Sequence, residues 1–135
     1  MTALVFPDVT AAACAALDDA LPAVLGRPAP AGNRVPDPRP ARFIVAYRSG
    51  GTRATIVTEA AQVSFDCYGD TQADAEDVAG AARAVLFALK GTRSVDGTDI
   101  YDVFDVGGHV DAPDPLSDQP RVLFSLALVV RGHTP

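Results

Sequence analysis

The stretch AQVSFDCYGDTQADAEDVAGAARAVLFALKG, Ala61 to Gly91, decides the fold of this chain. Its first part alternates apolar and polar side chains, the period of a strand with one wet face: Val63, Phe65 and Cys67 against Gln62, Ser64 and Asp66. The apolar spacing then changes to three and four, as on one face of a helix: Ala75, Val78, Ala79, Ala82, Val85, Leu86 and Leu89. The stretch therefore predicts a buried strand followed by an amphipathic helix.

Signals for both helix ends lie inside the same stretch. Asp70 or Thr71 can accept the free N–H groups of the first turn, and Asp74 stands three residues after Thr71, as in a capping box. Gly91 can adopt the left-handed conformation that stops a helix. We expect the helix to run from the cap at Thr71 toward Gly91.

The amino-terminal part predicts a second helix and an extended arm. Asp8 is a good N-cap for the alanine-rich segment that follows, and Pro22 predicts that this helix ends or kinks near Ala20 to Leu21. The segment GRPAPAGNRVPDPRP, Gly26 to Pro40, holds five prolines and two glycines, so it favours an extended arm. So long an arm within a compact domain is uncommon unless something holds it.

Two strands are predicted next, Arg42–Arg48 and Thr52–Glu59, joined as a β-hairpin by Ser49-Gly50-Gly51. Basic side chains gather on or beside this hairpin in an otherwise acidic chain: Arg39, Arg42, Arg48 and Arg53. They can protect an edge strand by charge, or they can face an acidic surface of a neighbouring copy. Both interpretations remain open at this point.

The carboxyl-terminal part predicts a strand at Ile100–Val106, a loop that begins at Gly107-Gly108-His109, and a last strand at Arg121–Arg131. That last strand is apolar on both faces, so it should be buried on both sides. One face has Val122, Phe124, Leu126, Leu128 and Val130, and the other has Leu123, Ala127 and Val129. The whole chain, residues 1–135, therefore predicts a single α+β domain. We expect a mixed or mainly antiparallel sheet of about five strands with two helices packed on one face. The proline-rich arm or another subunit must cover the second apolar face, which predicts self-association.

Composition narrows the class of protein. The 135 residues carry a net charge of −6, which argues against a surface that tracks nucleic-acid phosphates. No apolar run reaches the length of a membrane helix, and the amino terminus lacks the pattern of a secretory signal. The two cysteines, Cys14 and Cys67, are interpreted as small buried thiols rather than as a disulfide, a metal site or a nucleophile.

Motifs for catalysis are missing from the sequence: it contains no nucleophile elbow, P-loop, dinucleotide fingerprint, zinc-protease motif or paired cysteines. His109, near Asp105 and Asp111, can act as a general base, although a solvated loop histidine is the commoner case. Four acidic residues between Asp105 and Asp118 do not follow a calcium-loop pattern and are typical of turns. We expect no enzyme activity, cofactor or metal, and we interpret Asp66 and Asp70 as a polar or channel-facing surface.

The layout resembles the tail terminator proteins of long-tailed, siphovirus-type phages that infect actinobacteria. The similarity spans Asp8 to Gly132, and four local features carry it most strongly: the Ser-Gly-Gly hairpin, the Asp-Thr-Gln-Ala-Asp-Ala helix start, Gly107-Gly108, and Pro-Asp-Pro…Gln-Pro-Arg before the last strand.

This resemblance implies a structural virion protein that assembles in the cytoplasm of the host bacterium. It implies a homo-oligomeric ring, usually of six copies, that caps the tail tube and meets both the major tail tube protein and the head-completion proteins of the neck. Phage DNA would slide through its lumen without specific binding. For the subunit contact we expect the four arginines together with the apolar residues of the last strand: Arg39, Arg42, Arg48, Arg53, Leu123, Ala127 and Val129. Asp66 and Asp70 are expected at the lumen or polar face.

Two alternatives remain. One is another connector of the neck, such as a head-closure or joining protein. The other is a small enzyme or ligand-binding domain that uses His109, which a deep pocket around that residue would favour.

Overall fold

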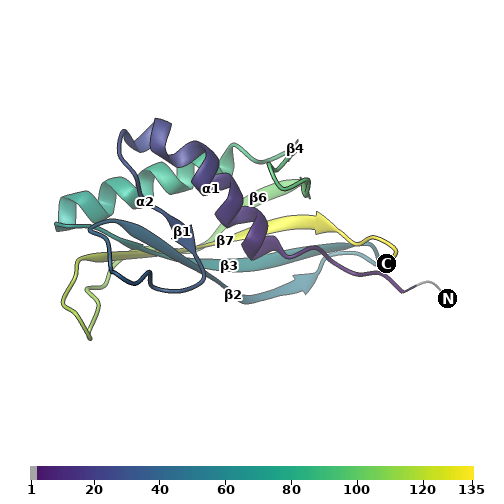
Figure 1. Ribbon diagram of the computed structural model, residues 1–135. Coiled ribbons are helices and arrows are strands. Elements are labelled where there is room, and N and C mark those ends of the chain that lie inside the picture. The colour runs from purple at the N-terminus through teal and green to yellow at the C-terminus, as the bar shows by residue number, and fades with distance from the viewer. Residues whose placement is uncertain (1–2) are drawn as a thin grey trace.

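The computed structural model describes residues 3–135. They form a five-stranded sheet with both helices packed on the same side (Figure 1). The strand order is β1-β2-β3-β7-β6, with β1 parallel to β2 and every other neighbouring pair antiparallel. A separate two-stranded ribbon joins β4 to β5. The bounds are α1 Val9–Leu25, β1 Ala31–Gly32, β2 Phe43–Arg53, β3 Thr58–Tyr68, α2 Gln72–Phe87, β4 Thr92–Arg93, β5 Asp99–Ile100, β6 Asp102–Asp111 and β7 Arg121–Arg131. The predicted α+β class, with a mixed five-stranded sheet and two helices on one face, is confirmed.

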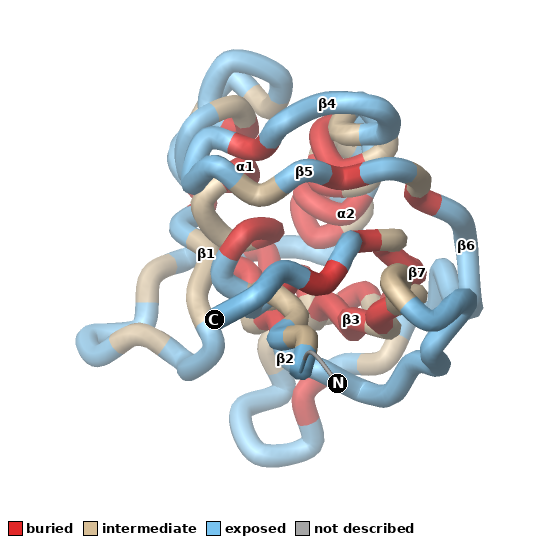
Figure 2. Tube along the Cα trace, turned by 90° about the vertical axis from the view of Figure 1, so that its right-hand side faces the viewer, coloured by how far each residue is buried: buried red, intermediate tan, exposed pale blue. Residues whose placement is uncertain are grey.

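The core lies between the sheet and the helices (Figure 2). Alternate residues of the two central strands point into it, and Phe65 of β3 stacks on Phe124 of β7 with 5.0 Å between ring centroids. The apolar stripe predicted for α2 is buried from Ala75 to Leu86. The sheet therefore owes its stability mainly to one apolar face covered by two helices.

The amino-terminal caps of both helices follow the sequence signals, but the carboxyl-terminal ends do not. The predicted stop at Gly91 is wrong, because α2 ends at Phe87 with Ala88 as its C-cap, and Gly91 lies in the turn that follows. The Asp8 side chain accepts from Ala11 N at 3.0 Å, and Thr71 Oγ1 accepts from Asp74 N at 3.1 Å. The prediction that α1 ends or kinks near Ala20 to Leu21 is wrong about its end, because the helix continues through Pro22 to Leu25. Pro22 lies in the last turn of α1, and its carbonyl oxygen still accepts from the N–H of Gly26. Because proline lacks a backbone N–H, the helix loses a single hydrogen bond at this position.

The predicted hairpin turn at Ser49-Gly50-Gly51 is wrong. Strand β2 continues through these residues to Arg53 with a bulge between Arg48 and Gly50, and the turn lies at residues 54–57. Gly51 is needed for close approach, since a Cβ there would lie 2.4 Å from the carbonyl oxygen of Ala60.

The predicted loop at Gly107-Gly108-His109 is also wrong. Strand β6 runs on to Asp111 and carries two bulges, one between Asp105 and Gly107 and one between Gly108 and Val110. Gly108 has a φ of 83°, and a Cβ there would lie 2.5 Å from the carbonyl oxygen of Leu123. The glycines again allow two strands to pair closely around a bulge, rather than ending the strand.

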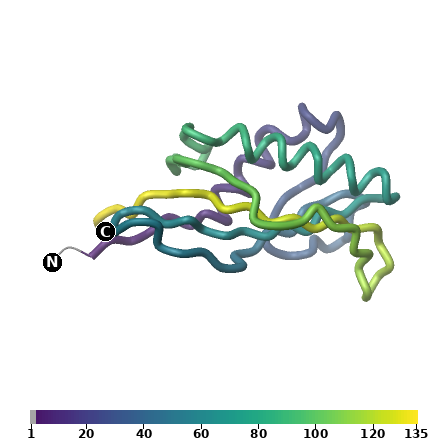
Figure 3. Tube along the Cα trace, turned by 180° about the vertical axis from the view of Figure 1, so that it is seen from behind, coloured from purple at the N-terminus to yellow at the C-terminus, as the bar shows by residue number. Residues whose placement is uncertain are grey.

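The two ends of the sheet differ. The segment after β6, residues 112–120, projects beyond the sheet at one end, and the amino and carboxyl termini lie together at the other (Figure 3). The termini are joined there by a bridge between Val5 and His133. The long axis of the molecule thus runs along the strands.

Candidate interaction surfaces

The face of the sheet opposite the helices, which we call the open face, combines apolar and polar residues that the sequence analysis had assigned to different roles. The register places Leu123 directly opposite Asp66, Ala127 opposite Gln62, and Val129 opposite Ala60. The expected interface residues of the last strand and the expected lumen residue Asp66 therefore share one surface. Ala127 is buried, whereas Leu123 and Val129 are partly exposed.

A row of hydroxyl groups crosses the middle of the open face. Ser64 of β3 hydrogen-bonds Ser49 of β2 and Ser125 of β7, both at 2.7 Å between oxygens. The bulge in β2 supplies Ser49, which has no partner of its own in the strand ladder. We call Ser49, Ser64, Ser125 and Asp66 the polar strip.

Asp66 is the charged residue of the polar strip. Burial raises the pKa of its carboxyl, against the opposing charge of Arg121 and a hydrogen bond from Tyr47. Within the described residues its Oδ1 atom is buried without a hydrogen-bond partner. A shallow hollow of about 310 Å³ lies over this carboxylate, lined by Tyr47, Gln62, Val106 and Val110 among others. A partner packed flat on this face would desolvate the carboxylate further, whereas water can solvate it.

One end of the open face is closed by the arm and the projecting segment. Arg39 lies over the rings of Phe43 and Tyr68, 5.5 and 5.7 Å from their centroids. Its guanidinium donates to Ser117 Oγ at 3.0 Å and to Gln119 Oε1 at 2.8 Å. Phe43 and Tyr68 are buried as a result, so the proline-rich arm supplies part of the cover that the sequence analysis required.

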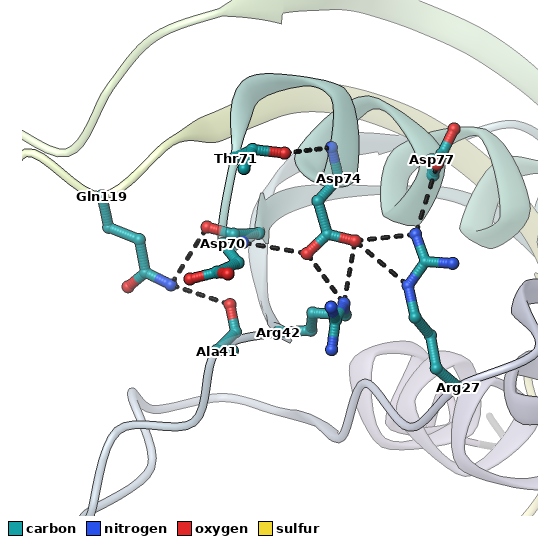
Figure 4. A network of polar contacts seen from close by, with 9 residues as sticks. Arg27, Ala41, Arg42, Asp70, Thr71, Asp74, Asp77 and Gln119 are labelled. Atoms are coloured by element: carbon teal, nitrogen blue, oxygen red, sulfur yellow. Dashed lines mark hydrogen bonds and ion pairs between the residues drawn. The ribbon is translucent and has the colours of Figure 1, made fainter.

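Asp74, in the first turn of α2, holds both ends of the arm (Figure 4). Arg27, at the start of the arm, donates to Asp74 Oδ1 at 2.7 Å. Arg42, just after the arm, lies 2.7 Å from Oδ2, and the Asp70 N–H donates to the same oxygen at 2.9 Å. The Asp74 side chain is 8% exposed. The arm is thus pinned to the body of its own subunit.

The charge of Asp74 is stabilised by these contacts. Burial alone would raise its pKa, but the hydrogen bonds from Arg42, the Asp70 N–H and Arg27 outweigh burial and lower the pKa to about 2. Asp70 lies at this site, at the start of α2, and its exposed side chain is not part of the open face with Asp66.

The remaining arginines of the expected contact lie farther along β2. Arg48 pairs with Glu59 of β3 and also donates to the carbonyl oxygen of Gly50 at 2.5 Å. Arg53 lies over the ring of Phe6, 5.1 Å from its centroid. Arg39 and Arg42 are held by internal partners at one end of the sheet. Arg48 and Arg53 lie on the part of β2 that extends beyond its pairing with β1.

His109 does not form the expected couple with Asp105. Its ring contacts Glu76 of α2, while Asp105 pairs with Arg83 at 2.7 Å. Asp111 lies beside Glu76, and a hydrogen bond between the two carboxyl groups raises the pKa of Asp111. These contacts tie strand β6 to α2, and the hollow over Asp66 does not include His109 in its lining.

The acidic residues of the projecting segment serve its conformation. Asp114 is buried and accepts from the Leu116 N–H at 3.0 Å and from Ser117 Oγ at 2.9 Å.

Within residues 3–135 no three His, Cys, Asp or Glu side chains gather as metal ligands would. Cys14 and Cys67 are both free thiols, and burial raises the pKa of Cys14 to about 11. None of the helices in this part of the chain has the length and apolar character needed to cross a membrane.

Comparison with known proteins finds a likeness of fold. No family model and no curated protein matches the sequence. Among solved structures, the chain is similar to a protein of the virion of a native gene transfer agent particle. The two share 19% sequence identity with a TM-score of 0.60, over 92% of this chain and 95% of the other. At this identity the likeness establishes a common fold across nearly the whole of both chains.

Proposed function

We propose that this protein is a structural component of a virion, and that its role there is that of a tail terminator. Six copies form a ring that caps the tail tube at its full length, stops its polymerisation, and joins it to the head-completion proteins of the neck. The observation that carries the proposal is the fold likeness, over 92% and 95% of the two chains, to a virion particle protein. The finer role rests on the resemblance in sequence layout to tail terminators.

The open face suits the wall of a lumen. The polar strip offers serine hydroxyls that bond one another and one carboxylate, and it carries no cation that would attract phosphate. We therefore assign Leu123, Ala127 and Val129 to the lumen wall together with Asp66, instead of to the subunit contact, because the register places them on the same surface. DNA can then pass without binding.

The helices face outward in this arrangement, and the two ends of the sheet become the two rims of the ring. One rim carries the projecting segment, and the other carries the termini and the β2–β3 turn. The tail tube and the neck proteins would then meet opposite rims. Assembly takes place in the cytoplasm of the host bacterium before the tail joins the head.

Removal of the gene from its phage tests the proposed role. We expect tails of uncontrolled length and heads without tails, because a tube that lacks its cap continues to polymerise. Electron microscopy of the lysate measures tail length directly. Tails of normal length that are merely separated from heads would contradict a terminator and favour a neck connector.

Complementation of the deletion tests the alternative that the protein is an enzyme using His109. A plasmid copy carrying His109→Ala should restore tail length as well as the wild-type gene does, because a structural ring needs no general base. If this variant fails as completely as the deletion while its protein remains folded and abundant, a chemical role for His109 is favoured.

A further inference from the structure

Both edges of the sheet lack a neighbouring strand over most of their length within residues 3–135. Strand β1 pairs with β2 only at Ile44 and Val45, so the rest of β2, from Ala46 to Arg53, has β3 on one side alone. At the opposite edge, β6 pairs only with β7. Such edges present backbone N–H and C=O groups to any strand that can lie beside them.

The free edge of β2 is accessible. A hollow of about 590 Å³ lies beside it, between this strand, the first turn of α1 and the arm. Ala46, Tyr47 and Arg48 form its β2 side, and Asp8 and Asn33 lie across from them. A strand from another molecule therefore has room to approach.

The two edges carry opposite charge. The free part of β2 has Arg48 and Arg53 and no acidic residue, whereas β6 has Asp102, Asp105 and Asp111 and no lysine or arginine. The internal partners leave these groups in reach of solvent, since the side chains of Arg48 and Asp105 are 43% and 54% exposed. Pairing β2 with β2, or β6 with β6, sets like charges together, while pairing β2 with β6 sets unlike charges together.

The register also places these charges at matching levels. Arg48 is opposite Val63, Val63 is opposite Leu126, and Leu126 is opposite Asp105. Arg48 and Asp105 thus occupy the same row of the sheet at its two edges. The side chains of Arg48 and Asp105 both lie on the helix side of the sheet, because Val63 and Leu126 are core residues.

A second row, on the open face, reaches both edges farther along. Thr52 is opposite Ala60, Ala60 is opposite Val129, and Val129 is opposite Asp102. Thr52 is therefore level with Asp102, whereas the side chain of the next residue, Arg53, lies on the helix side of the sheet, in the row of Val130. Cyclic rotation moves no copy along the ring axis, so when the strands run along that axis each level of one copy meets the same level of the next.

The strand directions are compatible with this contact. Three successive antiparallel pairings separate β2 from β6, so the two edge strands run in opposite directions. In a ring of identically oriented copies, β2 of one copy would meet β6 of the next in antiparallel fashion.

We propose that the sheet continues from copy to copy through antiparallel pairing of β2 with β6 of the neighbour, with Arg48 at Asp105 and Thr52 at Asp102. This contact is heterologous, so it does not stop at a dimer, and it gives a ring when the rotation between copies closes. It rests on the proposed function, for which it identifies the subunit interface.

A charge exchange tests the contact. Variant A carries Arg48→Glu and Arg53→Glu, and variant B carries Asp102→Lys and Asp105→Lys. Each alone sets like charges at every contact and should lose the ring in light scattering. An equimolar mixture sets unlike charges at every contact and should recover rings of alternating copies. Arg93→Glu, a charge reversal on the separate β4–β5 ribbon, should leave assembly unchanged.

A disulfide provides a second test that leaves the charged pairs intact. Thr52→Cys with Asp102→Cys, in a Cys14→Ser background, places two thiols at one level on opposite edges. Oxidation should give a ladder of covalent oligomers from the double variant and none from either single variant. Dimers from a single cysteine variant, or rings that persist in variant A alone and in variant B alone, would overturn the pairing of β2 with β6. Neither result would contradict the proposal that the protein forms a ring. A wild-type protein that forms no ring would overturn both proposals.

Discussion

Replacement of Asp74 by alanine should lower the free energy of unfolding by about 3 kcal/mol, because it leaves Arg27 and Arg42 without their shared, nearly buried partner. It also removes the acceptor of the Asp70 N–H at the start of α2. Urea unfolding followed by circular dichroism measures the loss. The matched control is Asp77→Ala, which removes only the 3.2 Å contact of a side chain that is 65% exposed and should cost less than about 1 kcal/mol.

The same substitution should release the proline-rich arm. Trypsin should cut after Arg34 faster in Asp74→Ala than in the wild type or in Asp77→Ala, because Arg27 and Arg42, on either side of the arm, lose their shared partner and only Arg39 keeps its own. Equal rates of cleavage in all three proteins would contradict the assignment of Asp74 as the residue that holds the arm.

The contribution of Asp74 to stability also depends on pH. Its pKa in the folded protein, about 2, lies below the ordinary value of 3.8. A lowered pKa means that the unfolded chain binds a proton first, so the stabilisation is complete above about pH 4 and is lost as the pH falls toward 2. Asp74→Asn should abolish this part of the acid-induced loss, and an unchanged acid profile in this variant would contradict the ion pairs described.

Replacement of Gly69 by alanine should lower the free energy of unfolding by about 3 kcal/mol, whereas the same replacement at Gly80 should raise it. Gly69 joins the end of β3 to the cap of α2, and a Cβ there would lie 2.3 Å from the backbone N of Ala75. The helix would have to shift from the sheet to make room. Gly80, inside α2, has open space at the same position, so Gly80→Ala should stabilise the protein by about 1 kcal/mol.

Thermal unfolding of both glycine variants distinguishes the two effects. Opposite shifts in Tm, down for Gly69→Ala and up for Gly80→Ala, are expected from the packing of the first turn of α2 against β3. A Gly69→Ala protein as stable as the wild type would show that this packing is looser than described.

Local signals were enough to predict the strand–helix unit at the centre of the fold. The Thr71 cap depends on neighbours in sequence, and the alternation of β3 reports burial on one face directly. The glycine pairs were misread because turns and bulges both favour glycine. What decides between them is the partner strand, and β3 is long enough to pair with β2 past the glycines up to Arg53.

The roles of the arginines depend on distant residues. Arg27 and Arg42 find Asp74 across 47 and 32 residues, and Arg39 finds Gln119 across 80. The capping pattern marked Asp74, but no local feature marked its two cationic partners. The shared surface of Asp66 and Leu123 likewise follows from the pairing of β3 with β7, which the sequence does not specify.

The mass and shape of the purified protein test the central claim most directly. Light scattering combined with negative-stain images should show rings with a central hole and a mass of about 84 kDa, six copies of the 14.0 kDa chain. A protein that remains a 14.0 kDa monomer at every concentration measured would contradict the ring.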